Sequence, residues 1–494
     1  MSILHDTEKK FAALNVHSPL YLKTKTNPYG GGDIGDIYQL IDVASSAGFS
    51  VIEFLPIQDT GYSPSPYMGI SVFSYNPIHL SLQGIEKNER ILELERARIR
   101  QVESGEKESI DYKQLYLFKC AILKELYESS HKAASIKIDR FSREEIAYAL
   151  FSVLRKKYET KWVHWPDEYK QANIDKILQS HKELEAQVKI ILFTQATLKK
   201  QWQEVALYGK EKGVEIALEK PIYPVFDSAE VWSNQELFYL NDNGSLRYES
   251  GCNNPRDPFG PQRWGHAVYQ FKEKPRETTE YFLKSIKFLS RFSKIIKLDH
   301  TLALIWKYYI IDTKTGRGKR VLPLGEKLFS ALRKNFPDIF FIAEDVGYIN
   351  EKMIDEPLKK FSVAGMRCLH WTNRLKYTQI HKYPRLTVAV ASYANTLSLP
   401  AWLRAITKKE KNIFLSQIKD KKDRKKGIWS YIELIFKSNA ILASVSLRDL
   451  VFDLRRYNHA GVKNFRNWKF RSPLHLEETD FSKISNIISF SGRK

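Results

Sequence analysis

The sequence predicts an α/β protein in which buried parallel strands alternate with helices. The chain has 494 residues, 43% of them hydrophobic, and short apolar runs recur along it between stretches of helical pattern. Buried parallel strands form continuous apolar runs because helices cover both faces of their sheet. Their alternation with helices over this length is typical of a parallel α/β fold. The runs lie at residues 50–55, 214–218, 295–299, 340–344, 387–392 and 443–447.

Residues 37–47 have the amphipathic spacing of a helix and precede the first run, which ends at Pro56. Two later runs end in a carboxylate, at Asp299 and at Glu344. In a closed barrel the carboxyl ends of the strands carry the chemistry, because the loops there meet on one open face. An open doubly wound sheet would place such residues in the same way, so the strand ends alone do not choose between the two folds.

Residues 85–203 have a different pattern, dominated by long polar helices. We interpret them as a largely helical insertion within a single catalytic domain that spans residues 1–494, because no internal repeat, low-complexity tract or Gly/Ser linker separates them from the rest. Residues 30–32 are three consecutive glycines, but neither the Lys-Ser/Thr pair of a phosphate loop nor a dinucleotide-binding spacing accompanies them. We expect a turn at this triplet.

The composition indicates which kinds of partner to expect. The formal net charge is +21, from 78 Lys+Arg against 57 Asp+Glu. Such a charge would suit a nucleic-acid partner. The basic residues are scattered, however, and the densest run, at residues 419–426, contains two Asp and resembles a solvated helix end or loop. With no zinc-ligand spacing or RNA-binding signature beside it, we predict no nucleic-acid partner.

The cysteines indicate the compartment. Cys120, Cys252 and Cys368 are the three cysteines of the chain and lie far apart, which favours a reducing compartment over a disulfide framework or a zinc site. The N-terminal residues lack the charged and apolar regions of a signal peptide. No apolar run approaches the roughly 20 residues needed to cross a bilayer. We expect a cytoplasmic protein with no metal and no membrane partner; the oligomeric state is left open.

Eight blocks in order resemble one enzyme family. NPYGGGDIG, from Asn27, is similar to the turn P-Y-G-x-G-D-L-G, and LPIQDTGYSPSPYMGISVFSYNP, from Leu55, is similar to L-P-x-x-P-T-G-x-x-x-S-P-Y-x-x-x-S-x-F-x-x-N-P. The other blocks lie at residues 221–232, 260–269, 298–300, 325–329, 342–347 and 364–369. Together they resemble the 4-α-glucanotransferases (amylomaltases) of glycoside hydrolase family 77. The resemblance implies a (β/α)8 TIM barrel with helical insertions that acts on α-1,4-glucans without a cofactor.

Retaining transfer between sugars needs a nucleophilic carboxylate and a second carboxyl that acts first as acid and then as base. By the resemblance, Asp299 is the nucleophile and Glu344 the acid/base. The alternative for Asp299 is a strand-end residue that caps the next helix. Asp345 competes with Glu344 on sequence alone, but only one of two neighbours on a strand points into the barrel mouth. The acid/base should have a pKa raised by burial and by the nearby nucleophile.

The resemblance also implies substrate-binding residues. Tyr67 matches a tyrosine that stacks below the cleaved sugar, and His300 matches a histidine near the acceptor. Asp227 matches a residue that holds the loops of the site, while Trp264 and Trp232 are candidates to line the sugar groove. Ordinary core packing is the alternative for the aromatic residues, and a buried hydrogen-bonded histidine is the alternative for His300.

The sequence departs from the family pattern at the site. Lys297 replaces an arginine two residues before the nucleophile, which keeps the charge but loses the planar fork of donors. The family's transition-state-stabilising Asp aligns with Ala394 or Asn395, so Asn395 is the candidate for that role and supplies no charge. The family's acceptor loop P-P-D-x-F-S reads NNPRDPF at residues 253–259, and no arginine follows shortly after His300. Loss of a transition-state contact costs several kcal/mol.

Two functions therefore compete. The first is a 4-α-glucanotransferase that moves α-1,4-glucan segments between maltodextrins by a retaining double displacement, with activity weakened by these departures. The second is a catalytically degenerate relative that binds glucan without turnover. Plain hydrolysis is a further alternative, in which reducing ends would accumulate rather than be redistributed.

Overall fold

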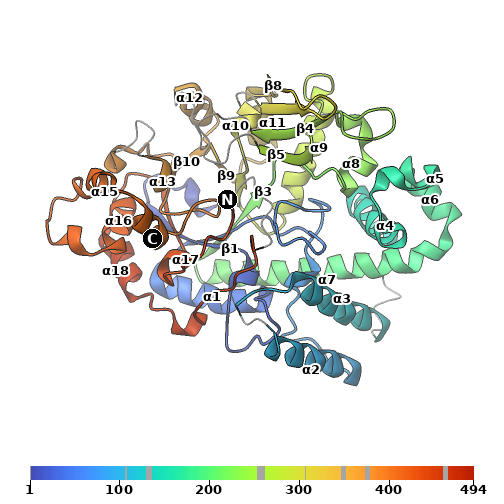
Figure 1. The fold of residues 1–494 in the computed structure, drawn as a ribbon, viewed down its shortest axis with the longest axis horizontal. Helices are drawn as coiled ribbons and strands as arrows, with labels where there is room; N and C mark the ends of the chain where they lie inside the picture. The colour runs from blue at the N-terminus through green and yellow to red at the C-terminus, as the bar shows by residue number, and fades with distance from the viewer. Residues whose placement is uncertain are drawn as a thin grey trace.

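The computed structural model describes residues 2–105, 108–129, 136–252, 262–305, 308–345, 352–372, 379–459 and 466–493. Eight parallel strands close into a barrel in the order β1-β12-β11-β10-β9-β6-β3-β2 (Figure 1). The strands are β1 (Phe11–His17), β2 (Val51–Phe54), β3 (Glu215–Lys220), β6 (Ile295–Leu298), β9 (Phe340–Ala343), β10 (Ala364–Cys368), β11 (Thr387–Val390) and β12 (Leu442–Ser446). The TIM barrel is confirmed. Because β1 pairs with both β12 and β2, the open doubly wound alternative is wrong.

Each of the six predicted runs overlaps one barrel strand, and the sequence patterns missed the other two. β1 carries Asn15 and His17, and β10 carries Arg367, so neither forms the continuous apolar run expected of a buried strand. All residues of β1 and β10 are nevertheless buried. The polar side chains are accommodated by partners inside the protein; Asn15, for example, donates from Nδ2 to Glu53 over 3.3 Å.

The predicted helix at residues 37–47 is α1 (Ile34–Ala47). It begins at the N-cap Asp33, which accepts from the backbone N–H of Gly35 over 2.9 Å, and the side chain of Asp36 accepts from the backbone N–H of Asp33 over 2.8 Å. It ends at Gly48, whose φ of 90° lies in the left-handed region open to glycine. Further helices around the barrel are α9 (Pro275–Leu289), α11 (Glu326–Asn335), α12 (Lys352–Lys360), α14 (Leu399–Ala405), α15 (Lys408–Leu415), α16 (Ile428–Phe436) and α18 (Ser482–Phe490).

The glycine triplet lies just before α1. Gly30 has a φ of 89°. A Cβ on Gly32 would lie 2.2 Å from the carbonyl oxygen of Pro19, so only glycine lets the chain pass this close.

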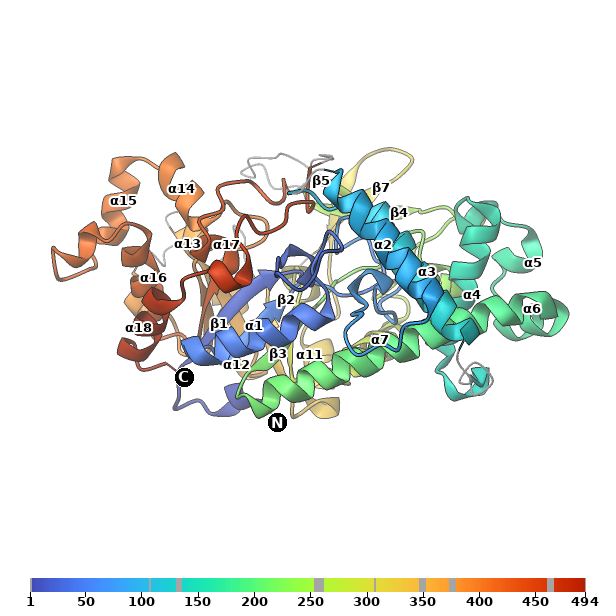
Figure 2. The same cartoon turned by 90° about the horizontal axis from the view of Figure 1, so that it is seen from below.

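The chain between β2 and β3 forms several helices on one side of the barrel. They are α2 (Glu89–Glu103), α3 (Tyr112–Ser129), α4 (Arg143–Tyr158), α5 (Asp167–Lys170), α6 (Ile174–Ser180) and α7 (Glu185–Glu211). Figures 1 and 2 show α7 running from the outlying helices α5 and α6 back to the barrel, where it leads into β3. At 27 residues it joins these outlying helices to the barrel as one continuous rod. That residues 85–203 are an insertion in a single domain stays a prediction.

A second, four-stranded antiparallel sheet has the order β5-β4-β7-β8. Its strands are β4 (Tyr248–Cys252), β5 (Gln262–Ala267), β7 (Tyr308–Asp312) and β8 (Gly318–Val321). The sequence patterns did not predict this sheet, because β4, β5 and β8 lack continuous apolar runs and the short apolar run of β7 was not recognised as a strand. It lies at the top of the view in Figure 1.

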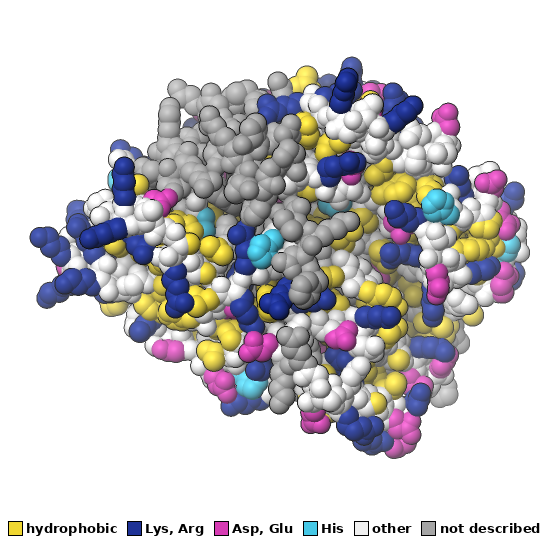
Figure 3. Space-filling model, in the orientation of Figure 1, with side chains coloured by type: hydrophobic (Ala, Val, Ile, Leu, Met, Phe, Trp, Pro, Cys, Tyr) yellow, Lys and Arg dark blue, Asp and Glu magenta, His cyan; other side chains and the backbone are white. Residues whose placement is uncertain are grey.

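The surface carries many basic side chains. On the face shown in Figure 3, Lys and Arg side chains are spread over the molecule, with several at the end where α15 lies. The lysines of the run at 419–426 are exposed. Among the helices that the structure describes, none is both long enough and apolar enough to cross a membrane.

Candidate active site

Asp299 and Glu344 lie side by side at the carboxyl ends of β6 and β9. The register pairs Leu298 with Ala343, which brings the two residues that follow to the same level. Backbone hydrogen bonds fix both positions: the N–H of Asp299 donates to the carbonyl of Lys220 and the N–H of Glu344 to that of Leu298, each over 3.0 Å. The two predicted catalytic carboxyls therefore face each other at the barrel mouth.

A third carboxylate, from Glu219 at the end of β3, joins this pair. One oxygen from each of Glu219, Asp299 and Glu344 lies within 4.8 Å of the other two. The side chain of Glu219 is fully buried. Glu219 was not predicted from the sequence because the apolar run was taken to end at residue 218, one residue short. The rule that found Asp299 and Glu344, a carboxylate closing an apolar strand, would have found it.

Lys297 contacts Glu219 from the neighbouring strand. The register pairs Glu219 directly with Lys297, so both side chains point into the barrel. The Lys297 ammonium lies 2.5 Å from Glu219 and donates to the Tyr393 hydroxyl over 2.6 Å. Burial alone would lower the pKa of Lys297, because it disfavours the charged form. The charges of Glu219, Glu53 and Glu344 together outweigh burial and raise the pKa of Lys297. Lys297 is thus directed at Glu219 rather than at Asp299, the residue it was expected to position.

The electrostatics of the pair favour a shared proton. Burial raises the pKa of Asp299 well above its usual value, and the charges of Glu344 and Glu219 raise it further. Burial also raises the pKa of Glu344, with the charge of Glu219 as the next cause. Two neighbouring carboxyls with raised pKa values titrate as a unit, so the site retains a proton under conditions in which isolated carboxyls are ionised.

Asp345, the neighbour of Glu344, points away from the site. Its Oδ2 lies 2.9 Å from the guanidinium of Arg367, and its Oδ1 accepts from the backbone N–H of Met366 over 2.7 Å. Successive side chains on a strand face opposite sides, so the ion pair of Asp345 with Arg367 leaves Glu344 facing the mouth.

His300 and Trp264 lie beside the pair. The ring centroids of His300 and Trp264 are 5.2 Å apart in an edge-to-face arrangement. Burial lowers the pKa of His300 to about 4, so its imidazole is neutral at pH 7 and can both donate and accept a hydrogen bond. His300 has a φ of 41°, a left-handed conformation that is strained for a non-glycine residue. Its backbone N–H lies 3.5 Å from a carboxyl oxygen of Glu344.

Tyr67 reaches the same cluster from a long loop. Its hydroxyl donates to Glu219 over 2.8 Å, and its ring is 5.9 Å from that of Trp468. Its loop starts at a buried carboxylate, Asp59, where the family pattern has proline. Asp59 accepts from the Tyr148 hydroxyl of α4 over 2.6 Å and from the Tyr116 hydroxyl of α3 over 3.2 Å. Two helices outside the barrel therefore hold the loop that delivers Tyr67.

Asp227 and Trp232 lie apart from the three carboxylates. Asp227 accepts from the backbone N–H of Trp162 over 3.3 Å and lies 3.2 Å from Arg155. Trp232 is fully buried and donates from Nε1 to the carbonyl of Tyr169 over 2.8 Å. Both residues fasten the helices between β2 and β3 to the segment after β3. Trp232 belongs to the core, the alternative that the sequence left open.

The stretch that replaces the family's stabilising Asp supplies no charge. Asn395 is half-buried and accepts from Nδ2 of Asn458 over 2.6 Å. Ala394 is fully buried. The preceding residue, Tyr393, instead brings a hydroxyl to the cluster and donates to Glu219 over 3.0 Å. The altered acceptor loop at 253–259 lies outside the described residues.

Oxygen atoms from three carboxylates could in principle hold a hard cation. Here, however, an ammonium already contacts Glu219, and two tyrosine hydroxyls occupy its oxygens. The arrangement therefore suits two facing carboxyls that exchange a proton with a substrate, next to a third carboxylate neutralised by Lys297.

The chain is similar to known proteins along most of its length. The sequence profile of the 4-alpha-glucanotransferase family matches residues 19–476. The 4-alpha-glucanotransferase of Aquifex aeolicus is 25% identical over 492 residues, which cover 96% of this chain and 98% of that protein. That of Thermus thermophilus is 27% identical over 472 residues and covers 90% and 92%, and that of Clostridium butyricum is 26% identical over 495 residues and covers 96% and 100%.

Solved structures show the same fold. An amylomaltase from Streptococcus agalactiae, in complex with acarbose, superposes with a TM-score of 0.85 at 20% identity and covers 98% of this chain and 100% of that one. An amylomaltase from Corynebacterium glutamicum superposes with a TM-score of 0.79 at 14% identity and covers 100% and 77%.

Proposed function

The chain belongs to the 4-alpha-glucanotransferase family, and from this premise we propose that it transfers α-1,4-glucan segments between maltodextrins by a retaining double displacement. One observation carries the proposal: Asp299 and Glu344 present carboxyl oxygens within 4.8 Å of each other at the barrel mouth. Retaining enzymes hold their two carboxyls about 5 Å apart, because no water has to fit between nucleophile and sugar.

In the first step, Asp299 attacks the anomeric carbon of the donor sugar and Glu344 gives its proton to the departing glycosidic oxygen. In the second step, Glu344 takes the proton of an acceptor 4-hydroxyl, which displaces Asp299 and re-forms an α-1,4 bond. Burial raises the pKa of both carboxyls, so the pair keeps a proton that Glu344 can donate at the start of each cycle.

Around this pair we propose that Tyr67, His300 and Trp264 bind sugar. The neutral imidazole of His300 can donate to or accept from a hydroxyl, and the Trp264 ring beside it offers an apolar face. Lys297 keeps Glu219 neutralised and so limits the negative charge around Asp299. Asn395 and Asp227 are then positioning residues, because each bonds to protein rather than to the carboxyl pair.

The missing carboxylate at 394 and 395 had favoured a degenerate glucan-binding relative. Neither the family match nor the relatives support that alternative. Glu219 supplies a carboxylate at the site from a different strand. We also propose a cytoplasmic location; the cysteines support it, since Cys120, Cys252 and Cys368 form no disulfide.

The test is incubation of the purified protein with maltotriose. Transfer yields glucose together with longer chains, while the total number of reducing ends stays constant. Asp299→Asn and Glu344→Gln should each abolish this redistribution, and Asp420→Asn, at an exposed position, should leave it unchanged. An unaltered sugar profile with the wild-type protein contradicts the proposal, and a steady rise in reducing ends would indicate hydrolysis instead.

A further inference from the structure

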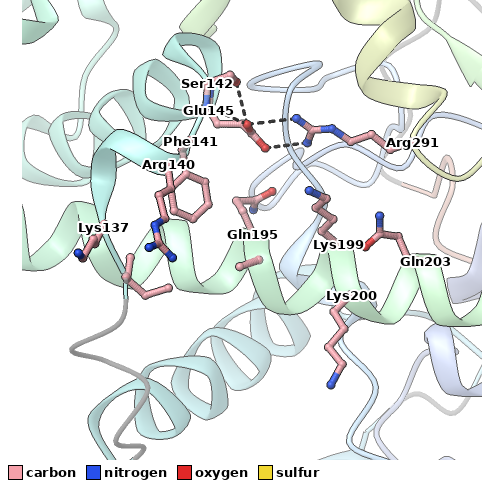
Figure 4. Close-up of a pocket in the computed structure, with 12 residues that line it drawn as sticks. Lys137, Arg140, Phe141, Ser142, Glu145, Gln195, Lys199, Lys200, Gln203 and Arg291 are labelled. Atoms are coloured by element: carbon pink, nitrogen blue, oxygen red, sulfur yellow. Dashed lines mark hydrogen bonds and ion pairs between the residues drawn. The ribbon is translucent and has the colours of Figure 1, made fainter.

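A cavity of about 500 Å³ lies outside the catalytic mouth, between the barrel and the helices that precede β3 (Figure 4). One wall is formed by the segment before α4 and the start of α4, the floor by α7, and the far side by Arg291, which follows α9. Its volume falls in the range of small-molecule sites, about 300–1,000 Å³.

The lining of this cavity is strongly basic. Its charged side chains are one carboxylate, Glu145, and five cations, Lys137, Arg140, Lys199, Lys200 and Arg291. Asp139 is exposed and does not line the cavity.

Only part of this positive charge is neutralised. The two oxygens of Glu145 lie 2.7 and 3.2 Å from the two terminal nitrogens of Arg291, a two-pronged ion pair drawn as dashed lines in Figure 4. Lys200 lies 3.6 Å from Glu204. Within the part of the chain that the structure describes, the side chains of Lys137, Arg140 and Lys199 have no hydrogen bond or ion pair. Three cationic side chains thus line the cavity without an ion-pair partner.

We propose that this cavity binds a small molecule that carries a phosphate group. The guanidinium of Arg140 offers a planar fork of donors that matches phosphate oxygens, and Lys137 and Lys199 add mobile point charges. Figure 4 shows Lys199 extending from α7 toward the Glu145–Arg291 pair, whereas Lys200 extends to the opposite side of the helix. Phe141 adds an apolar ring to the same wall, against which a sugar or base attached to the phosphate can pack.

The chemistry of this cavity differs from that of the catalytic site. The barrel mouth presents three carboxylates, which repel an anion, and glucans are neutral molecules with no need for three cations. The proposal therefore concerns a second ligand and does not depend on the transferase activity.

The experiment is calorimetric titration of the intact protein with inorganic pyrophosphate at low salt. We expect saturable binding of one pyrophosphate per chain that is unaffected by maltotriose. Lys199→Met and Arg140→Met should each raise the Kd at least about tenfold, the effect of one lost charge-assisted hydrogen bond. Lys210→Met is the matched control, because Lys210 is an exposed lysine of the same helix that does not line the cavity; its Kd should equal that of the wild type.

Thermal unfolding and maltotriose turnover should be the same in all three variants, which shows that the fold is intact. The proposal is overturned if the wild-type titration does not saturate. It is equally overturned if Lys210→Met weakens binding as much as Lys199→Met does, because binding would then follow the overall charge of the protein rather than this cavity. Competition between maltotriose and pyrophosphate would also contradict it, since it would place the anion at the barrel mouth.

Discussion

Replacing Lys297 by methionine should test the charge balance inside the barrel. The side chain of Lys297 is 8% exposed and that of Glu219 is 0% exposed, so the two charges form a buried ion pair. Methionine has nearly the same length but no charge. It would leave Glu219, Glu53 and Glu344, whose charges raise the pKa of Lys297, without the ammonium.

The expected loss of folding stability depends on which buried charges lose their partner. Removing one partner of a buried ion pair costs about 3–5 kcal/mol, because the other charge remains buried and unpaired. We expect Lys297→Met to fall in this range, a large fraction of the roughly 5–15 kcal/mol that stabilise a folded domain. Glu219→Gln should cost only about 1–2 kcal/mol, because Lys297 retains the charges of Glu53 and Glu344.

The measurement is urea unfolding of the wild type, both single variants and the double variant at pH 7. In the double variant neither charge of the pair remains, so its cost should be less than the sum of the single costs by about 2 kcal/mol or more. Lys297→Arg, which keeps the charge, is the control and should stay within about 1 kcal/mol of the wild type.

Three results would refute this reasoning: a cost below about 1 kcal/mol for Lys297→Met, a larger cost for Glu219→Gln than for Lys297→Met, or costs that add within about 0.5 kcal/mol. Each would mean that the ammonium does not neutralise Glu219 in the folded protein.

The remaining predictions concern the catalytic pair and the segments around it. Asp299→Asn should abolish maltotriose turnover yet raise the unfolding midpoint at pH 7. Burial raises the pKa of Asp299 in the folded state, so between its unfolded-state and folded-state pKa values the folded protein binds more protons than the unfolded chain, and stability falls as pH rises through that window. An unchanged or lower midpoint would count against a carboxylate whose charge is disfavoured by burial. The kcat/KM profile should fall at low pH as the carboxyl pair gains a second proton and at high pH as the pair loses its shared proton. Burial raises the pKa of both carboxyls, so both limbs should lie above the ordinary carboxyl range near 4, and a flat profile from pH 4 to 7 would be inconsistent with this. Tyr148→Phe should lower the free energy of unfolding by about 1–3 kcal/mol and raise KM, because it removes the 2.6 Å hydrogen bond to the buried Asp59 that holds the Tyr67 loop. Tyr116→Phe, which loses a 3.2 Å hydrogen bond to the same carboxylate, should have a smaller effect. Equal or reversed effects would contradict the role of Tyr148 as the main anchor. Ala394→Asp should destabilise the protein by several kcal/mol, because position 394 is fully buried. Asn395→Asp should cost under about 1 kcal/mol, because its carboxylate can still accept from Asn458. Urea unfolding distinguishes the two variants, and a well-tolerated Ala394→Asp would contradict this expectation.

The fold was predictable where the strands obey a simple pattern. Six barrel strands coincide with mostly apolar runs, and each was found from sequence even though β2 and β6 each contain one charged residue, Glu53 and Lys297. β1 and β10 were missed because Asn15, His17 and Arg367 interrupt their runs with polar side chains. The antiparallel sheet was missed because β4, β5 and β8 have no continuous apolar pattern and the short apolar run of β7 was not recognised as a strand. In both cases the environment that makes a polar residue acceptable comes from other parts of the chain, which a local pattern does not contain.

The candidate site shows the same limit. Asp299 and Glu344 were found because each closes an apolar strand within a recognisable block. The partners of Lys297 were not foreseeable from its neighbours in sequence, because Glu219 and Tyr393 reach it from two other strands. Residues 394 and 395, which align with the family's stabilising Asp, supply no carboxylate, whereas the third carboxylate lies on β3. Pairing across a barrel joins residues that sequence order separates.

The pairing of β1 with β12 has a consequence for biosynthesis. These two strands are more than four hundred residues apart in the chain, yet the cylinder is sealed only when Phe11 to Asn15 meet Leu442 to Ser446. At a ribosomal rate of about 5–20 residues per second, the first strand waits on the order of half a minute for its last neighbour. During that time one edge of β1 has unsatisfied backbone groups, the kind of surface on which nascent chains aggregate or recruit chaperones.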